Sequence, residues 1–111
     1  METETALLGF AALSQSTRLE TFRLLVRHEP EGLAAGEIAD RLSVPANTLS
    51  AHLGVLSRAG LVTATRHSRS IVYRADLSQL SHLVLFLVKD CCQSRSELCQ
   101  PLVAELAPCC D

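Results

Sequence analysis

The sequence predicts a mainly α-helical domain with one small β-hairpin. Apolar residues recur at helical spacing over most of the first 60 residues, two short segments rich in β-branched residues follow, and a strongly apolar stretch comes after them. A chain of 111 residues is long enough for one domain with a small core. Two helices joined by a short turn and followed by a hairpin form a winged helix-turn-helix, which is the fold class we expect.

Two helices are predicted before residue 30. The first has four apolar residues on one face: Leu7, Leu8, Ala11 and Ala12. The second has an apolar stripe of its own: Leu19, Phe22, Leu25 and Val26. We expect Ser14 or Ser16 to cap the second helix, because a serine hydroxyl accepts hydrogen bonds from the amide groups at a helix start. Residues 29–32, which include a proline and a glycine, end this helix.

The next two helices are joined by a short turn at residues 43–45. The earlier helix is expected to point four apolar residues inward: Ala35, Ile38, Ala39 and Leu42. In the later helix Leu49, Leu53 and Leu56 recur at positions i, i+4 and i+7, so they share one buried face. Gly60 stands where a helix C-terminal glycine is expected.

A β-hairpin and a last helix complete the predicted domain. Residues 61–65 and 70–74 are rich in β-branched side chains and predict its two strands. The polar residues between them, 66–69, are expected to form an exposed tip. The last helix begins near Leu77 and is apolar all round over residues 83–88. One of its faces can therefore cover the core and the other a partner helix.

Charge is unevenly distributed along the chain. The net charge is −2, yet no acidic residue lies between Asp40 and Asp76. The basic residues of this window are Arg41, Arg58, Arg66, Arg69 and Arg74, together with His52 and His67. Because attraction to phosphate depends on the charge that faces the duplex, a positive middle can bind DNA although the whole protein is acidic. A solvated arginine-rich surface is the alternative explanation.

The fourth helix has the composition of a DNA recognition helix. Opposite its leucines it carries Asn47, Thr48, Ala51 and Arg58, with Ser50 and His52 on the flanks. Short polar side chains allow close approach to the major groove, and asparagine can bond adenine through two hydrogen bonds. Arginines at the hairpin tip, Arg66 and Arg69, can reach phosphates or the minor groove. The alternatives are a plain solvated helix with locally bonded Ser50 and His52, and tip arginines that only keep a loop soluble.

Several runs of sequence together resemble the ArsR/SmtB family of repressors, which sense arsenic or metals. They are residues 12–19 (ALSQSTRL), residues 48–53 (TLSAHL) followed by Leu56, residues 59–62 (AGLV), and the hairpin residues Arg69 and Tyr73. The resemblance covers about residues 6–90. It implies a homodimer joined through its first and last helices, with one recognition helix in each half-site of a pseudo-palindromic operator. In this chain Pro45 replaces a frequent serine cap, Ser68 the usual glycine of the hairpin, and Gly54 a frequent lysine.

All five cysteines fall in the last 21 residues: Cys91, Cys92, Cys99, Cys109 and Cys110. The thiol pair that the family often carries on its third helix is missing here, and Asp76 and His82 are not followed by the second pair that a last-helix zinc site needs. Thiolates select soft ions, and trivalent arsenic binds three of them in a shallow pyramid. Cys91, Cys92 and Cys99 are therefore the expected arsenic ligands.

This arsenic site sets a condition on the last helix. In an unbroken helix Cys99 lies about 10 Å beyond Cys92, so the helix must end between them or Cys99 must come from the partner chain. Cys109 and Cys110 are second choices as ligands, as an auxiliary transfer site or as a competing pair; the alternative is that they only belong to a mobile end. We accordingly expect a DNA-binding and dimerisation domain over residues 1–92 and a cysteine-containing tail over residues 93–111 that completes the inducer site.

The sequence thus predicts a cytoplasmic repressor that binds double-stranded operator DNA as a homodimer and is released by arsenite, as in arsenical resistance. Methylated trivalent arsenicals, antimonite, another soft ion or a thiol redox switch are alternative signals. A cytosolic thiol ion carrier without DNA binding is the alternative from another class. No phosphate-binding glycine loop, catalytic carboxylate pair or nucleophile with a base is found, so we expect no enzyme, no organic cofactor and no membrane partner.

Overall fold

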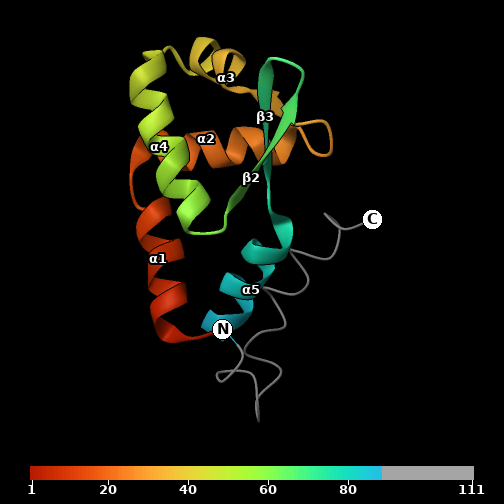
Figure 1. Ribbon diagram of the computed structural model, residues 1–111. Helices are drawn as coiled ribbons and strands as arrows, with labels where there is room; N and C mark the ends of the chain where they lie inside the picture. Colours follow the sequence, from red (N-terminus) through yellow and green to blue (C-terminus); the bar gives the residue numbers. More distant parts are fainter. Residues whose placement is uncertain (89–111) are drawn as a thin grey trace.

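The computed structural model describes residues 1–88 of the 111-residue chain. Five helices and three short strands follow one another along it: α1 (Thr3–Leu13), α2 (Ser16–Arg27), β1 (Leu33–Ala34), α3 (Ala35–Leu42), α4 (Ala46–Arg58), β2 (Val62–His67), β3 (Ser70–Ala75) and α5 (Leu77–Val88). Figure 1 shows α1 and α5 together at one end of the molecule, and α3, the start of α4 and the hairpin tip at the other. The predicted winged helix-turn-helix is confirmed.

Leucines of α4 form the centre of the core. Leu49, Leu53 and Leu56 are each at most 1% exposed, as their spacing predicts. They pack in one hydrophobic cluster with residues from every helix, including Leu25 of α2, Ile38 of α3 and Leu83 of α5: all three are at most 1% exposed. Because one face of α4 is anchored in this cluster, its opposite face is held outward in a fixed orientation.

The helix starts and faces differ in part from the prediction. Neither Ser14 nor Ser16 caps α2, because the cap is Gln15, whose side-chain oxygen accepts a hydrogen bond of 2.9 Å from the Arg18 amide. In α1 the buried residues are Ala6, Gly9 and Ala12. Leu7 and Leu8, which were expected to share a face with Ala12, are 60% and 62% exposed. Leu7 and Leu8 therefore face away from the core, whereas Phe10 and Leu13 of the same helix pack against it.

The sheet has one strand more than the predicted hairpin. The strand order is β1-β3-β2, all antiparallel, with Leu33 opposite Tyr73 in the two-residue strand β1. The hairpin tip is also shorter than expected: β2 extends through His67, which pairs with Ser70, so only Ser68 and Arg69 form the turn. The strand β1 was not predicted because two residues are too few to show an alternating pattern. The end of β2 was not predicted because its residues are polar, so backbone pairing extends the strand where hydrophobicity gives no signal.

Glycine and serine at the two ends of β2 adopt the left-handed backbone conformation. Gly60, just after α4, has a φ of +78°, which confirms its prediction as the residue that ends this helix. Ser68 in the hairpin turn has a φ of +57°, a region in which glycine is favoured because it has no Cβ.

Among residues 1–88, no helix is long and apolar enough to cross a membrane.

Candidate nucleic-acid interface

The first two turns of α4 present a small polar surface. Asn47, Thr48, Ser50 and Ala51 are all exposed. Pro45, the residue before α4, supplies no side-chain cap, and the Asn47 side-chain oxygen instead accepts a 2.9 Å hydrogen bond from the Thr48 amide. The NH₂ group of the Asn47 side chain takes no part in this bond, so both of its N–H donors remain available.

His52 differs from the other predicted residues of α4 because it faces α2. Its ring is half-buried, and Nδ1 lies 3.3 Å from the Arg18 guanidinium. The same guanidinium donates a 2.7 Å hydrogen bond to the carbonyl of Ala12 at the end of α1. Arg18, in the first turn of α2, thus links the end of α1 to the middle of α4. His52 therefore neither lies on the exposed face with Asn47 and Thr48 nor bonds locally within its own helix: its contact is with Arg18, 34 residues earlier.

Arg58 lies at the far end of α4. It is the last residue of the helix, 11 residues after Asn47, which corresponds to about 16 Å along the axis. Its side chain is exposed and passes near Gly54, where an added Cβ would stand 3.4 Å from the guanidinium. The predicted residues therefore form two groups, one at the start of α4 and one arginine at its end.

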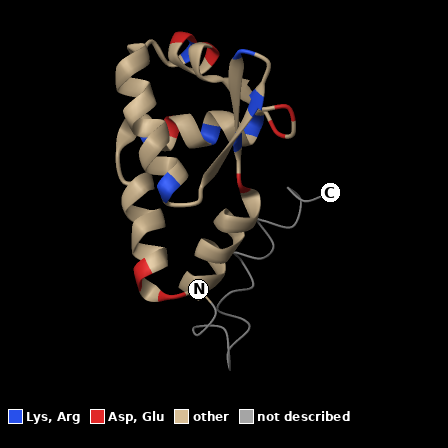
Figure 2. Ribbon diagram, in the orientation of Figure 1, with Lys and Arg blue, Asp and Glu red and all other residues tan. Residues whose placement is uncertain are grey.

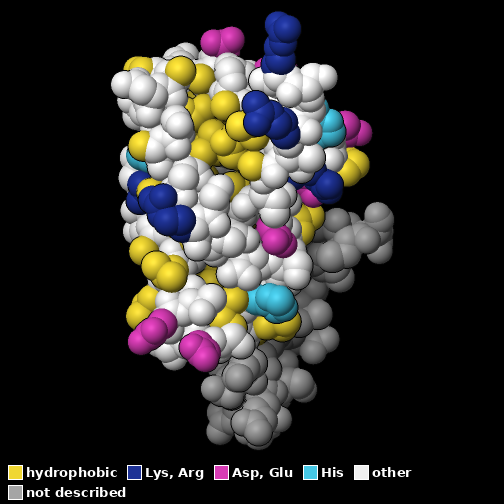
Figure 3. All heavy atoms as spheres, viewed as in Figure 1, with side chains coloured by type: hydrophobic (Ala, Val, Ile, Leu, Met, Phe, Trp, Pro, Cys, Tyr) yellow, Lys and Arg dark blue, Asp and Glu magenta, His cyan; other side chains and the backbone are white. Residues whose placement is uncertain are grey.

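The hairpin carries the remaining predicted residues. Arg66 is the second-last residue of β2 and Arg69 lies in the turn, and both side chains are exposed. In the space-filling view, positive side chains stand out on the hairpin and near the end of α4, with apolar surface between them (Figure 3). The hairpin tip lies at the same end of the molecule as the start of α4 (Figure 1). A long polyanion can therefore contact both elements at once.

The positive surface is smaller than the sequence window indicates. Arg74 of β3 forms a two-pronged ion pair with Glu29, with distances of 2.9 and 3.0 Å. Hydrogen bonding and Coulomb attraction to Glu29 raise the pKa of the Arg74 guanidinium. These partners lie 45 residues apart, so the sequence alone gives no sign of the pair. Figure 2 shows acidic residues beside the one arginine of α3, and the only arginine of α4, Arg58, is at the far end of that helix, so the hairpin supplies most of the positive charge near the start of α4.

Known proteins share both the sequence and the fold. A family model described as a helix-turn-helix domain matches residues 13–64. The repressor SmtB of Mycobacterium tuberculosis is 43% identical over 49 residues, 44% of this chain and 36% of SmtB, so the match spans about a third of that relative. The uncharacterized HTH-type regulator YbzH of Bacillus subtilis is 30% identical over 92 residues, which cover 70% of this chain and 90% of YbzH. The transcriptional activator HlyU of Vibrio cholerae is 28% identical over 83 residues, 75% of this chain and 74% of HlyU.

Solved structures extend the comparison over the whole fold. An ArsR-like regulator from Rhodococcus sp. RHA1 has a TM-score of 0.70 and 29% identity, covering 93% of this chain and 91% of its own. The chain belongs to the ArsR/SmtB family of winged-helix regulators. A homodimeric winged-helix domain from Mycobacterium bovis, described as a possible ArsR-family regulator, has a TM-score of 0.65 and 26% identity over 78% of this chain and 79% of its own. A possible regulator for arsenical resistance has a TM-score of 0.63 and 26% identity over 71% and 79%.

These ArsR/SmtB relatives are named as regulators of transcription, in agreement with the prediction that the chain is not an enzyme. The departures from the family pattern now have structural positions. Pro45 leaves the start of α4 without a side-chain cap, and Ser68 takes up the positive φ at the position where the family usually has glycine. Both departures keep the winged-helix backbone.

The predicted arsenic ligands Cys91, Cys92 and Cys99 lie outside the described residues, as do Cys109 and Cys110. The proposed domain boundary at residue 92, and the stretch between Cys92 and Cys99 in which the last helix was expected to end, are outside the described residues too. Within residues 1–88, no group of three or more histidine, cysteine or acidic side chains could hold a metal ion. Asp76 instead accepts a 3.1 Å hydrogen bond from the Gln79 amide at the start of α5, and His82 is exposed.

Two hydrogen bonds that the sequence did not predict join α5 to the end of α4. The Gln79 side chain donates a 3.2 Å bond to the carbonyl of Ala59, the residue that follows α4. The amide of Asp76 donates a 2.8 Å bond to the carbonyl of Leu61. The start of α5 is therefore attached directly to the end of the candidate recognition helix.

Proposed function

We propose that this chain is a transcriptional repressor that binds operator DNA as a homodimer and leaves it when arsenite binds the cysteines that follow α5. The observation that carries the DNA-binding half is the exposed small polar face at the start of α4, which lies at the same end as the arginines of the hairpin. The relation to SmtB, which is named a repressor, supports repression as the direction of control.

The two DNA-binding elements have different tasks. Asn47, Thr48 and Ser50 approach base edges or phosphates in the major groove, and the small Ala51 permits close contact. Arg66 and Arg69 contact the adjacent DNA phosphates or the minor groove. These contacts position α4 on the DNA without reading the base sequence. Arg58, about 16 Å from Asn47, contacts a more distant phosphate. His52 acts indirectly, because its contact with Arg18 orients α4.

Exposed leucines on the first and last helices supply the dimer contact. They are Leu7 and Leu8 of α1 and Leu85 and Leu87 of α5, each between 57% and 63% exposed. Burying each of them stabilises a dimer by about 1 to 2 kcal/mol. The homodimeric relative from Mycobacterium bovis supports this arrangement. Two copies related by a twofold axis then present two α4 helices to successive major grooves.

The inducer site uses Cys91, Cys92 and Cys99, with Cys109 and Cys110 as secondary thiols. Three thiolates suit trivalent arsenic, and one structural relative is described as a possible regulator for arsenical resistance. Ion capture beyond the end of α5 moves this helix, and the Gln79 contact with Ala59 carries the movement to the end of α4. The two α4 helices of the dimer then no longer match successive grooves, so the operator is released.

A binding titration tests the DNA-binding half. The dimer is titrated onto fluorescent promoter DNA and onto unrelated DNA at several salt concentrations. Arg66→Ala and Arg69→Ala should each weaken binding to both DNAs and reduce the salt slope by about 1, whereas Asn47→Ala should lose roughly tenfold on the promoter only. Arg23→Ala, which removes the same charge from α2, is the matched control and should bind as the wild type does. Equal affinity for both DNAs by the wild-type protein would instead indicate the thiol ion carrier.

Arsenite release tests the inducer half. Under reducing conditions, arsenite should dissociate the wild-type complex, and Cys91→Ser, Cys92→Ser and Cys99→Ser should each bind the operator but resist release. Cys110→Ser is the matched control and should still be released. Continued release of the triple variant contradicts the assignment. Release of the Cys99→Ser variant by a methylated arsenical, which needs two thiolates, indicates that smaller site, and release only after oxidation indicates a redox switch.

A further inference from the structure

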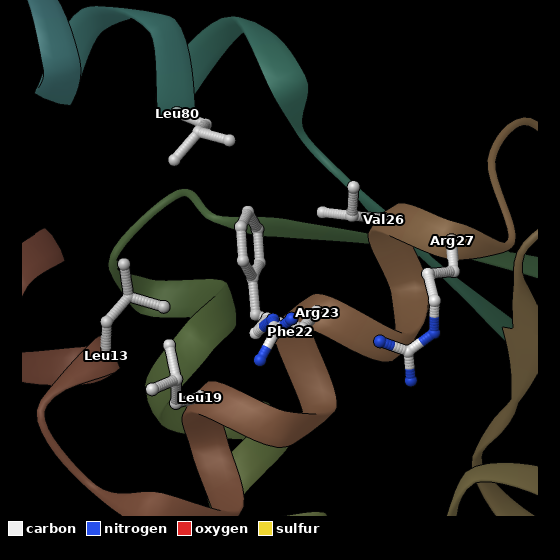
Figure 4. Close-up of a pocket in the computed structure, with 7 residues that line it drawn as sticks. All are labelled: Leu13, Leu19, Phe22, Arg23, Val26, Arg27 and Leu80. Atoms are coloured by element: carbon white, nitrogen blue, oxygen red, sulfur yellow. The ribbon is translucent and has the colours of Figure 1, made fainter. Parts of the chain in front are cut away.

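An apolar groove on α2 is separate from both surfaces described above. Its lining comes from the end of α1, from α2 and from the start of α5: Leu13, Leu19, Phe22, Val26 and Leu80. Arg23 and Arg27, on successive turns of α2, complete it, and its volume is about 390 Å³. Figure 4 shows Phe22 rising between Leu13 and Val26 toward Leu80. The groove therefore offers a hydrophobic floor beside two positive charges.

The two arginines at this groove lack a counterion within the part of the chain that the structure describes. The ion pair found among residues 1–88 joins Arg74 to Glu29 and involves neither Arg23 nor Arg27. Glu20 lines a neighbouring hollow with Arg23 and Arg27 but forms no ion pair with either. Leu19, at the edge of the groove, is 43% exposed. An occupant that suits these features is apolar and carries a carboxylate.

We propose that residues 101–107 of the same chain dock in this groove and place the Glu105 carboxylate between Arg23 and Arg27. This segment, PLVAELA, carries Leu102, Val103 and Leu106 at i, i+1 and i+4, which lie on one face of a helical turn. Glu105 stands beside that face, one residue before Leu106. The segment thus has both the apolar residues and the single negative charge that the groove requires.

The chain is long enough to make this contact. Leu80 lies eight residues before the end of α5, which corresponds to about 12 Å along the helix. Residues 89–100 can span up to about 40 Å when extended. The segment can therefore return from the end of α5 to the groove without disturbing the helices. A second copy of the chain is the other conceivable occupant, but the dimer contact proposed above uses Leu7, Leu8, Leu85 and Leu87, none of which lines this groove.

Docking also restricts the cysteines, a consequence that rests on the proposed function. Cys99 precedes the segment by two residues, and Cys109 and Cys110 follow it by two or three. A docked segment limits the positions that Cys99 can take relative to Cys92. Ion capture and docking are then coupled, since each fixes the same stretch of chain.

Amide hydrogen exchange on the reduced full-length protein tests the docking. In the wild type the amides of residues 102–107 should exchange at least about tenfold more slowly than in a free peptide of the same sequence. Glu105→Arg should bring the protection below about threefold, and Arg27→Glu combined with Glu105→Arg should restore it by reversing the ion pair. Glu97→Arg makes the same charge change elsewhere in the tail and should leave the protection unchanged.

Three results would overturn the proposal. Free-peptide exchange rates in the wild type mean that the segment does not dock, and equal effects of Glu97→Arg and Glu105→Arg mean that no specific pair forms. Protection that disappears on dilution to monomers means that the partner's segment occupies the groove. Operator binding by the Glu105→Arg variant is measured in parallel, and because the docking site lies away from α4 and the hairpin, its retention separates a failure of docking from a failure of the proposed function.

Discussion

The packing of α1 against α5 depends on a glycine, and a pair of substitutions tests it. Gly9 is buried in the middle of α1, and a Cβ built there would lie 2.9 Å from both terminal methyl groups of Leu83. Leu83 is 1% exposed, so it has little room to move. Gly9→Ala gains up to about 1 kcal/mol of helix propensity but incurs about 1 to 3 kcal/mol of overpacking. The net expected change is a loss of about 1 kcal/mol.

The sign of this effect should reverse when Leu83 is shortened. Leu83→Ala alone should cost about 3 kcal/mol, the sum of lost transfer free energy and a residual cavity. In that background the clash is gone, so Gly9→Ala should stabilise the protein by about 1 kcal/mol. Free energies of unfolding are obtained from urea titrations followed by circular dichroism at one protein concentration. Gly36→Ala, where the added Cβ meets nothing within 4 Å, is the matched control and should stabilise both backgrounds equally. If Gly9→Ala also has the same effect in both backgrounds, the close contact between α1 and α5 does not exist.

Three further changes have expected outcomes. Ser68→Gly should raise the free energy of unfolding by about 1 kcal/mol, because glycine adopts the positive φ of the hairpin turn without a Cβ penalty, and an unchanged urea midpoint would contradict this. Leu85→Glu should shift the protein from dimer toward monomer in sedimentation, whereas Ile71→Glu, on the hairpin, should not. Arg18→Ala should cost about 1 to 3 kcal/mol of stability through two lost hydrogen bonds, and thermal unfolding at the wild-type temperature would rule that out.

The sequence predicted those parts of the fold that depend on local periodicity. The leucines of α4 repeat at helical spacing and are buried, and Gly60 ends that helix with a positive φ. Contacts between distant residues left no such signal. The strand β1, at Leu33, exists because it pairs with β3, and the contact of Arg18 with His52 spans 34 residues. Such features arise from tertiary packing, which periodicity along one chain does not encode.

The candidate site was predictable to a similar extent. Because the buried leucines fix the orientation of α4, residues such as Asn47 and Thr48 had to face outward, and they do. The charge window overstated the positive surface, since Arg74 has a partner far away in the sequence. The predicted hairpin tip was longer than the observed turn, because a polar strand held by backbone pairing has the composition of a loop. The predicted thiol ligands lie beyond the described residues and stay a prediction.

The central claim is that the binding of operator DNA and the binding of arsenite to the same protein weaken each other. Arsenite affinity is therefore to be measured by calorimetry on the reduced dimer, once alone and once saturated with operator DNA. Thermodynamic linkage requires the operator to weaken arsenite binding by the same factor by which arsenite weakens operator binding, roughly 5- to 150-fold for a typical switch. Equal arsenite affinity with and without the operator would contradict the account, because ion binding would then be independent of DNA binding.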